Sequence, residues 1–252
     1  MLPVLNLGPL SVPVPEFALL LGFWMGSFIA ERKARSFLDD PGIIDRILWT
    51  SMAAGLIGAR LSFFARNTGA FSGELTSIFS LNLNLFDPIG GLLIALAVSI
   101  YIISKSGIPI LNILDRLSPF FSIFLGALHF SNFAAGKGYG SLSQIPWAIN
   151  LWGATRHPVQ LYYLLGSLIG FGVILFLLRN STYAQGVIFF VFVLITSVYM
   201  LFFSRYESYA NQFIFGFRLN QIIFWFTTLF SLIFLNKQSP SIRQALIHET
   251  KK

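Results

Sequence analysis

The chain has 252 residues, of which 55% are hydrophobic and only 11% charged, and its mean hydropathy is +0.73. Soluble domains carry about 25% charged residues, so this composition excludes an ordinary water-soluble domain and predicts a polytopic membrane protein. The sequence contains no cysteine, which excludes disulfides, thiolate metal sites and a cysteine nucleophile; thiol chemistry would have to use a sulfur of the substrate.

Seven apolar segments are each long enough to cross a bilayer as a helix, which takes about 20 residues. They predict an all-α polytopic membrane helical bundle, a single integral-membrane domain over residues 1–252 that ends in a cytoplasmic tail, 236–252. The predicted spans are 14–31, 46–66, 87–104, 113–133, 158–178, 184–203 and 216–236.

The lysines and arginines indicate how these spans are oriented. With the N-terminus outside, eleven of the 17 basic residues flank inner ends and six flank outer ends, which is the bias that orients helical membrane proteins. We therefore expect an exterior N-terminus and a cytoplasmic C-terminus, and the net charge of +7 needs no nucleic-acid partner to explain it. The six outer cations are Arg60, Arg66, Lys137, Arg156, Arg205 and Arg218.

Arg60 is the outer cation that is hardest to dismiss. It lies within the second span, in GLIGARLSFF, where Gly55 and Gly58 are predicted to let a neighbouring helix approach closely. An arginine inside a span costs at least about 2.5 kcal/mol unless it meets an anion, a partner or water. A functional role and a structural ion pair are equally open for this residue.

Further polar residues gather near the predicted outer ends of the spans. In LWGATRHPVQLYY, Arg156 and His157 precede a helix start, whose free amides favour an anion. An arginine fork grips phosphate oxygens in pairs, and histidine moves protons near neutral pH, so the set suits a phospholipid headgroup. It comprises Arg60, Asp87, His129, Asn132, Arg156, His157, Gln160, Arg205, Arg218 and Gln221.

The same residues also have purely structural interpretations. Arg156 can snorkel to headgroups, His157 can cap a helix, and Asp87 before Pro88 can simply end a loop and start a helix. Trp147, Trp152, Tyr162 and Tyr163 fit an aromatic belt, while Arg66, Lys137 and Glu207 fit ordinary interfacial charges. The functional interpretation predicts instead that one common cavity is faced by Arg60, Asp87, His129, Arg156 and Arg205.

Several motifs in chain order resemble one family. PWAINLWGATRHPVQLYY is the closest match, similar to a Pro-Trp segment followed by R-H-P-x-Q-L-Y-E. The other matching stretches are GPLSVPVPEFALLLGFWMGSFIAERKAR, GLIGARLSFF, DPIGGLL, LGALHFSNFAAGKGYG and FGFRLNQIIF. Over nearly its whole length the chain resembles the prolipoprotein diacylglyceryl transferases, seven-span enzymes of the bacterial inner membrane.

At several motif positions this sequence carries a different side chain from the family, while the surrounding motif residues still match. Asn132 keeps the asparagine of the signature G-R-x-G-N-F-x-N-x-E-x-x-G, and the outer arginine beyond the sixth span is either Arg205 or Arg218. The changed positions are Asp87 for the histidine of His-Gly-Gly, His129 for the signature arginine, Lys137 for the signature acid, Tyr163 for the acid after Gln-Leu-Tyr, and Pro15 near the tyrosine of the first helix.

The resemblance implies a specific reaction at the bilayer. The diacylglyceryl group of phosphatidylglycerol moves to the lipobox cysteine thiol of a lipoprotein precursor, a thioether forms and glycerol phosphate leaves, with no cofactor or metal. This reaction needs a proton acceptor and stabilisation of the departing phosphate. The implied catalytic residues are His157 or Asp87 as proton acceptor, with His129 and Arg156. The implied substrate-binding residues are Arg60, Asn132, Gln160, Tyr162, Arg205, Arg218 and Gln221.

Three other functions remain open from the sequence. The altered positions also suit a family-derived protein that has lost catalysis and only binds anionic lipid or a lipoprotein. A transporter is disfavoured, because no internal repeat is visible and the polar residues lie toward one face. A third possibility is a transferase on the same scaffold with another acceptor or lipid, since acceptor choice is expected in loops such as 67–86 and 134–155, whose sequences do not reveal it.

Overall fold

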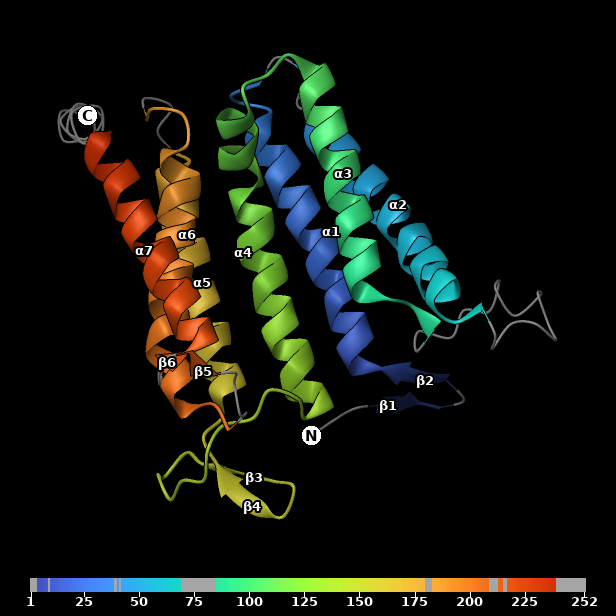
Figure 1. Cartoon of the computed structure of the whole chain (residues 1–252), viewed down its shortest axis with the longest axis vertical. Helices are drawn as coiled ribbons and strands as arrows, with labels where there is room; N and C mark the ends of the chain where they lie inside the picture. Colours follow the sequence, from blue (N-terminus) through green and yellow to red (C-terminus); the bar gives the residue numbers. More distant parts are fainter. Residues whose placement is uncertain are drawn as a thin grey trace. The chain divides into compact units, whose positions relative to one another are not determined.

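The computed structural model describes residues 4–8, 10–38, 40, 42–68, 85–179, 183–208, 213–214 and 217–238 (Figure 1). Its helices are α1 Val14–Ala34, α2 Gly42–Arg66, α3 Pro88–Ser106, α4 Ile110–Ala135, α5 Val159–Leu177, α6 Val187–Phe203 and α7 Leu219–Lys237. All seven are long and apolar enough to cross a membrane, which confirms the predicted all-α polytopic membrane fold. The orientation of the termini stays a prediction.

The helix bounds follow the predicted spans, with differences that have local causes. Helix α2 begins at Gly42, four residues before the predicted start, because its first turn carries the polar Asp45 and Arg46 that an apolar run leaves out. Helix α6 begins at Val187 rather than at residue 184, because Gly186 ahead of it adopts φ 89°, a left-handed conformation that stops the helix from extending backward.

Three short antiparallel hairpins lie outside the helices and were not predicted. They are β1 Val4–Leu7 with β2 Leu10–Pro13, β3 Ile149–Leu151 with β4 Ala154–Arg156, and β5 Phe213–Ile214 with β6 Phe217–Arg218. The turn between β3 and β4 has positive φ at both Trp152 (56°) and Gly153 (75°), as tight hairpin turns require. The predicted loop 134–155 therefore contains a hairpin, while most of 67–86 and the tail beyond residue 238 lie outside the described residues.

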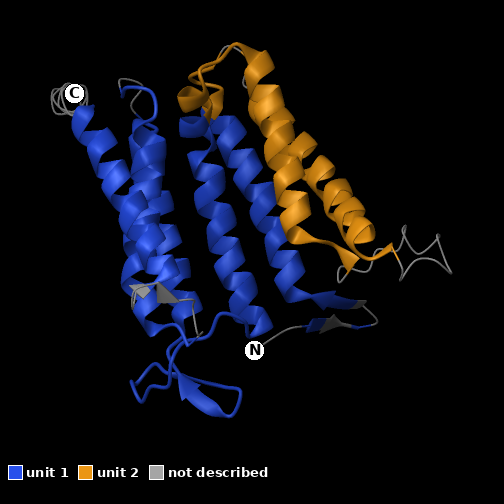
Figure 2. Cartoon of the chain, viewed as in Figure 1, with its two compact units in different colours: residues 1–33, 114–252 blue, residues 34–113 orange. Residues whose placement is uncertain are grey.

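The chain divides into two compact units, which Figure 2 colours separately. We call residues 34–113 the α2–α3 unit and residues 1–33 with 114–252 the five-helix unit. In the α2–α3 unit, a Cβ on Gly55 would lie 3.1 Å from Ala95, and one on Gly58 would lie 2.7 Å from Ile94. This confirms that both glycines permit close helix packing. The prediction of a single domain stays a prediction.

The five-helix unit is joined by small residues and by polar side chains. A Cβ on Gly26 of α1 would lie 3.0 Å from the Phe120 ring of α4. The Asp115 carboxylate of α4 accepts hydrogen bonds from the backbone amides of Gly186 (2.7 Å) and Phe189 (2.8 Å). These amides begin α6 and have no partner within the helix, so Asp115 fixes α4 against the start of α6.

Helices α5 and α6 approach most closely at Gly166, and this contact can be tested. A Cβ on Gly166 would lie 2.6 Å from the Tyr199 ring, and a rigid ring cannot yield as a flexible chain end can. We expect Gly166→Ala to lower the free energy of unfolding by about 1–3 kcal/mol, the usual cost of overpacking. Thermal unfolding in detergent measures the effect. Gly172→Ala on the same helix is the matched control, because nothing lies within 4 Å of its Cβ position; equal thermal midpoints for the two variants would contradict the close approach.

Candidate active site

The residues predicted for the site belong to both units. Arg60 and Asp87 lie in the α2–α3 unit, and the other nine lie in the five-helix unit. The sequence predicted one common cavity for five of these residues, and this stays a prediction. The five are Arg60, Asp87, His129, Arg156 and Arg205.

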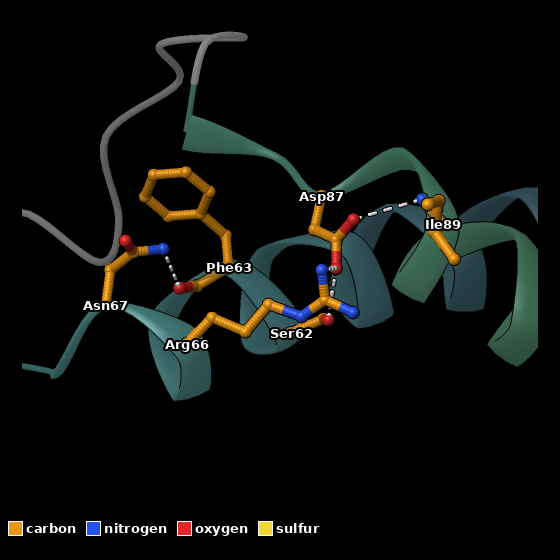
Figure 3. Close-up of polar contacts among 6 residues, drawn as sticks. All are labelled: Ser62, Phe63, Arg66, Asn67, Asp87 and Ile89. Carbon is orange, nitrogen blue, oxygen red and sulfur yellow. Dashed lines mark hydrogen bonds and ion pairs between the residues drawn. The ribbon is translucent and has the colours of Figure 1, made fainter.

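Asp87 forms the N-cap of α3 and is tied to α2 (Figure 3). Its Oδ1 accepts a hydrogen bond from the backbone N–H of Ile89 at 3.1 Å, and its Oδ2 accepts one from the Ser62 hydroxyl at 2.6 Å. Oδ2 also lies 3.3 Å from Nη1 of Arg66. The structural interpretation, in which Asp87-Pro88 starts a helix, is thereby confirmed; a catalytic role for Asp87 stays a prediction.

Arg60 lies on α2 and is 8% exposed. Its Nη1 donates to the backbone carbonyl of Leu85 at 2.8 Å, and its guanidinium carbon lies 5.5 Å from the centre of the Phe86 ring. These contacts hold the segment that leads into α3 against α2. They also show how the protein accommodates an arginine within a helix that is long and apolar enough to cross a membrane.

The capped Asp87 predicts a specific dependence of stability on pH. The hydrogen bond from Ser62, with the amides of Gly90 and Ile89 and the charge of Arg66, holds the pKa of Asp87 below its ordinary value, although desolvation opposes this. Because the folded pKa is the lower one, the ionised carboxylate stabilises the folded state at neutral pH. This contribution is lost as the pH falls below about 3.9, the unfolded value, and through the folded pKa.

We therefore expect the thermal midpoint of the wild type to fall more between pH 7 and pH 3 than that of Asp87→Asn. Asp40→Asn is the control, since the exposed Asp40 pairs only loosely with Arg46, at 3.5 Å. Its pH response should match that of the wild type. If Asp87→Asn and the wild type lose stability in parallel, the carboxylate contributes nothing in its ionised form.

In the five-helix unit, the chain around Arg156 and His157 is held by backbone hydrogen bonds between three segments, 139–143, 156–157 and 206–208, which we call the clasp. The segments come from the loop after α4, from β4 with the residue that follows it, and from the turn after α6. The donors and acceptors are Gly140 N to His157 O (3.2 Å), His157 N to Ser141 O (3.0 Å), Ser141 N to Tyr206 O (2.7 Å) and Ser208 N to Tyr139 O (3.2 Å). The clasp thus fixes Arg156 and His157 directly ahead of α5.

The Arg156 side chain extends along the clasp and is half-buried. Its Nε donates to the Leu151 carbonyl at 3.3 Å, and its Nη1 lies 3.4 Å from the Ser208 hydroxyl and 3.5 Å from the Gly140 carbonyl. Its guanidinium carbon lies 4.7 Å from the centre of the Tyr139 ring, within cation–π range. The guanidinium is therefore oriented by the protein, and these long hydrogen bonds leave it able to bind an anion.

His157 and Tyr162 meet at the start of α5. The His157 Nδ1 lies 3.3 Å from the Tyr162 hydroxyl, and that hydroxyl also accepts a hydrogen bond from the Trp147 indole at 2.8 Å. The His157 ring packs against Tyr206, with ring centres 4.7 Å apart. The imidazole is therefore held on two sides by aromatic residues.

His129 lies near the end of α4 among buried polar groups. It is 7% exposed, its ring lies 5.1 Å from the Tyr163 ring of α5, and its Nε2 atom is buried without a hydrogen-bond partner among the described residues. The Tyr163 hydroxyl donates to Oε1 of Glu207 at 2.6 Å. Tyr163 stands where the family carries an acid, and its hydroxyl is bound to the carboxylate of Glu207. From the sequence alone, Glu207 is interpreted as an ordinary interfacial charge.

Gln160 is the most buried of the predicted binding residues, at 2% exposed. Its Nε2 donates to the Lys137 carbonyl at 2.8 Å, while its Oε1 is buried and unpaired among the described residues. Asn132 is half-buried near the end of α4. A buried polar atom without a partner costs about 1–3 kcal/mol, so the unpaired oxygen of Gln160 calls for a water, an ion or another polar group that satisfies it.

The two arginines that compete for the family's outer arginine differ in their surroundings. Arg205 is exposed and makes no hydrogen bond or ion pair to any described residue. Arg218 is half-buried, and its Nη1 donates to the Ser204 carbonyl at 2.7 Å, which ties the start of α7 to the end of α6. Gln221 is half-buried on the first turn of α7.

Apolar grooves lie on the surface of the five-helix unit. One of about 500 Å³ is lined by side chains of α1, α4 and α5, and none of the predicted site residues lines it. Another, of about 300 Å³, lies between α5 and α6, and its lining includes Tyr162, Tyr199 and Phe203. Tyr162 therefore lies where an apolar groove meets the polar residues of the clasp.

The polar side chains brought together in the five-helix unit are basic and hydrogen-bonding groups. Among the described residues, no group of three or more His, Asp or Glu side chains could hold a metal ion. The clasp combines an oriented arginine with a half-buried histidine, and buried polar atoms of His129 and Gln160 lie on the neighbouring helices. The sequence did not indicate Glu207 and Trp147 as hydrogen-bond partners of Tyr163 and Tyr162. The signal that could have pointed to Glu207 was the acid missing after Gln-Leu-Tyr.

Comparison with known proteins supplies the relatives of this chain. The sequence profile of the family described as "Prolipoprotein diacylglyceryl transferase" matches residues 3–236. A phosphatidylglycerol–prolipoprotein diacylglyceryl transferase of Finegoldia magna is 25% identical over 72% of this chain and 70% of its own length. Proteins with the same description from Streptococcus suis and Vibrio atlanticus are each 27% identical, over 72% and 71% of this chain and 71% and 66% of their own lengths.

Proposed function

The chain belongs to the prolipoprotein diacylglyceryl transferase family, and from that premise we propose that it transfers diacylglyceryl from phosphatidylglycerol to the cysteine thiol of a lipoprotein precursor. The thiol sulfur displaces phosphate from the glyceryl carbon: a C–S bond forms, a C–O bond breaks, glycerol phosphate leaves with the bonding electrons, and the thiol loses its proton. The proposed setting is the bacterial inner membrane, with a lipobox cysteine as acceptor and no nucleic-acid partner.

The observation that carries this proposal is the position of Arg156 and His157. They belong to the motif that most resembles the family, and two backbone hydrogen bonds of the clasp hold His157 ahead of α5, to Gly140 and Ser141. Arg156 is proposed to bind the phosphate, because its guanidinium is oriented and lies outside the helices. Arg60, Arg205 or Arg218 would supply further positive charge, and Asn132, Gln160 and Gln221 would orient the headgroup.

His157 is the better supported of the two proposed proton-transfer residues. Asp87 already accepts hydrogen bonds at both carboxylate oxygens and pairs with Arg66. The His157 side chain hydrogen-bonds to described residues only through Nδ1, so its Nε2 has no such partner. His129, which stands at the signature arginine, is proposed to contribute through its unpaired Nε2.

The direct test is incubation of the purified protein with phosphatidylglycerol and a lipobox peptide, followed by mass measurement of the peptide. The proposal predicts a mass gain of one diacylglyceryl group. A peptide that binds but never gains mass would favour the alternative of a catalytically inactive, lipid- or lipoprotein-binding member of the family. Complementation of a strain that lacks its own transferase would separate the same alternatives in cells.

Arg156→Ala should reduce the lipidation rate at least about tenfold, because a hydrogen bond to a charged group contributes about 1.5–3 kcal/mol. Arg156→Lys should recover only part of the rate, since lysine keeps the charge and loses the planar fork. Arg179→Ala is the matched control: Arg179 follows α5 at its opposite end and is exposed. An undiminished rate in Arg156→Ala, with thermal midpoints unchanged, would remove this residue from the mechanism.

A further inference from the structure

The hydrogen bonds around Tyr162 have a defined direction because one donor cannot be reversed. The Trp147 indole carries an N–H and no acceptor, and it lies 2.8 Å from the Tyr162 hydroxyl oxygen. Tyr162 therefore accepts this bond. Trp147 belongs to the loop between α4 and β3, and the residue is 61% exposed although its N–H is bound to Tyr162.

The Tyr162 hydroxyl keeps its own hydrogen for a second bond. Among the described residues, its other polar contact is Nδ1 of His157, at 3.3 Å. A hydroxyl that already accepts a hydrogen bond becomes a better donor and a poorer acceptor, because hydrogen bonds in a chain polarise one another. The bond to His157 Nδ1 is therefore better made with Tyr162 as the donor than with Tyr162 as an acceptor for a second time.

We propose that Trp147 and Tyr162 are positioning residues that hold His157 in the tautomer with its proton on Nε2, so that the imidazole meets the reactants as a hydrogen-bond donor. A neutral imidazole that accepts at Nδ1 carries its hydrogen on Nε2. Nε2 makes no hydrogen bond to a described residue and is not among the buried unpaired atoms. Tyr206, 4.7 Å away between ring centres, holds the imidazole from another side.

The consequence for chemistry rests on the proposed transferase function. An Nε2–H on the residue next to Arg156 can donate to the oxygens of the departing phosphate, whose charge grows as the C–O bond breaks. In this tautomer His157 takes part in proton transfer as a donor to the departing phosphate, and it does not accept the thiol proton as the family resemblance implies. The thiol proton then passes to an oxygen of the departing glycerol phosphate, which leaves with it. Trp147, from the loop, thus acts on the reaction only through Tyr162.

The tautomer can be observed without any activity. Protein labelled with ¹⁵N-histidine and placed in lipid nanodiscs gives ¹⁵N signals that differ between a protonated and an unprotonated ring nitrogen, and the chain has only three histidines. His157→Gln assigns the signal of interest. The wild type should show His157 protonated on Nε2 at neutral pH, and both Trp147→Phe and Tyr162→Phe should turn this into a mixture of tautomers.

Trp152→Phe is the matched control, because the Trp152 indole also donates to the protein, to the Gly136 carbonyl at 3.1 Å, and that carbonyl is no part of the Trp147–Tyr162–His157 chain. Its His157 signals should match the wild type. A wild-type His157 protonated on Nδ1, or signals that Trp147→Phe and Tyr162→Phe both leave unchanged, would overturn the proposal.

The lipidation assay separates this proposal from the proposed function. Trp147→Phe should transfer diacylglyceryl about fivefold more slowly than Trp152→Phe and the wild type, the effect of one hydrogen bond. Failure of the wild type to lipidate would refute the transferase function and leave the ¹⁵N result to decide the tautomer. An active wild type with an equally fast Trp147→Phe would refute the catalytic consequence.

Discussion

The backbone hydrogen bonds of the clasp are the interaction on which the candidate site depends. Amide and carbonyl groups near a bilayer must find partners in the protein wherever water is excluded, so an irregular segment persists there only if another segment pairs with it. Gly140 makes this pairing possible, because a Cβ there would lie 2.5 Å from the His157 carbonyl and 2.7 Å from Val159. The loop after α4 and the turn after α6 therefore have to fold together before Arg156 and His157 are positioned.

Polar contacts between helices extend this organisation into the five-helix unit. Ser167 of α5 shares a hydrogen bond with the Tyr199 hydroxyl of α6 at 2.9 Å, close to where Gly166 lets the two helices approach. Thr228 of α7 donates to Ser197 of α6 at 3.0 Å. Lipid tails offer no hydrophobic drive for helix association, so such bonds and small residues fix which faces meet. α5, which begins two residues after the clasp, is thereby held to α6, and α6 is held to α7.

Hydropathy was sufficient to predict all seven helices, because a span must be long and apolar whatever its neighbours are. The pairing of distant irregular segments left no comparable pattern: Ser141 and Tyr206 are joined across 65 positions by backbone atoms that every residue shares. Side-chain roles divided in the same way. The N-cap at Asp87 was readable from its proline neighbour, whereas the partnership of Glu207 with Tyr163 arises only from the fold.

Asp87, Tyr163 and His129 replace residues of the family pattern, and they differ in how many of their polar atoms have a hydrogen-bond partner. Asp87 is saturated by Ser62, Ile89 and Arg66, and Tyr163 is satisfied by Glu207, so both substitutions are accommodated within the unit that contains them. His129 is accommodated only in part, because its buried Nε2 lacks a partner among the described residues. An unpaired buried polar atom lowers the stability of the folded protein, and a polar molecule that hydrogen-bonds to it removes this cost. Of these three positions, His129 is thus the one whose side chain keeps a polar atom unpaired among the described residues, whereas the polar atoms of Asp87 and Tyr163 are bound to neighbouring side chains and backbone.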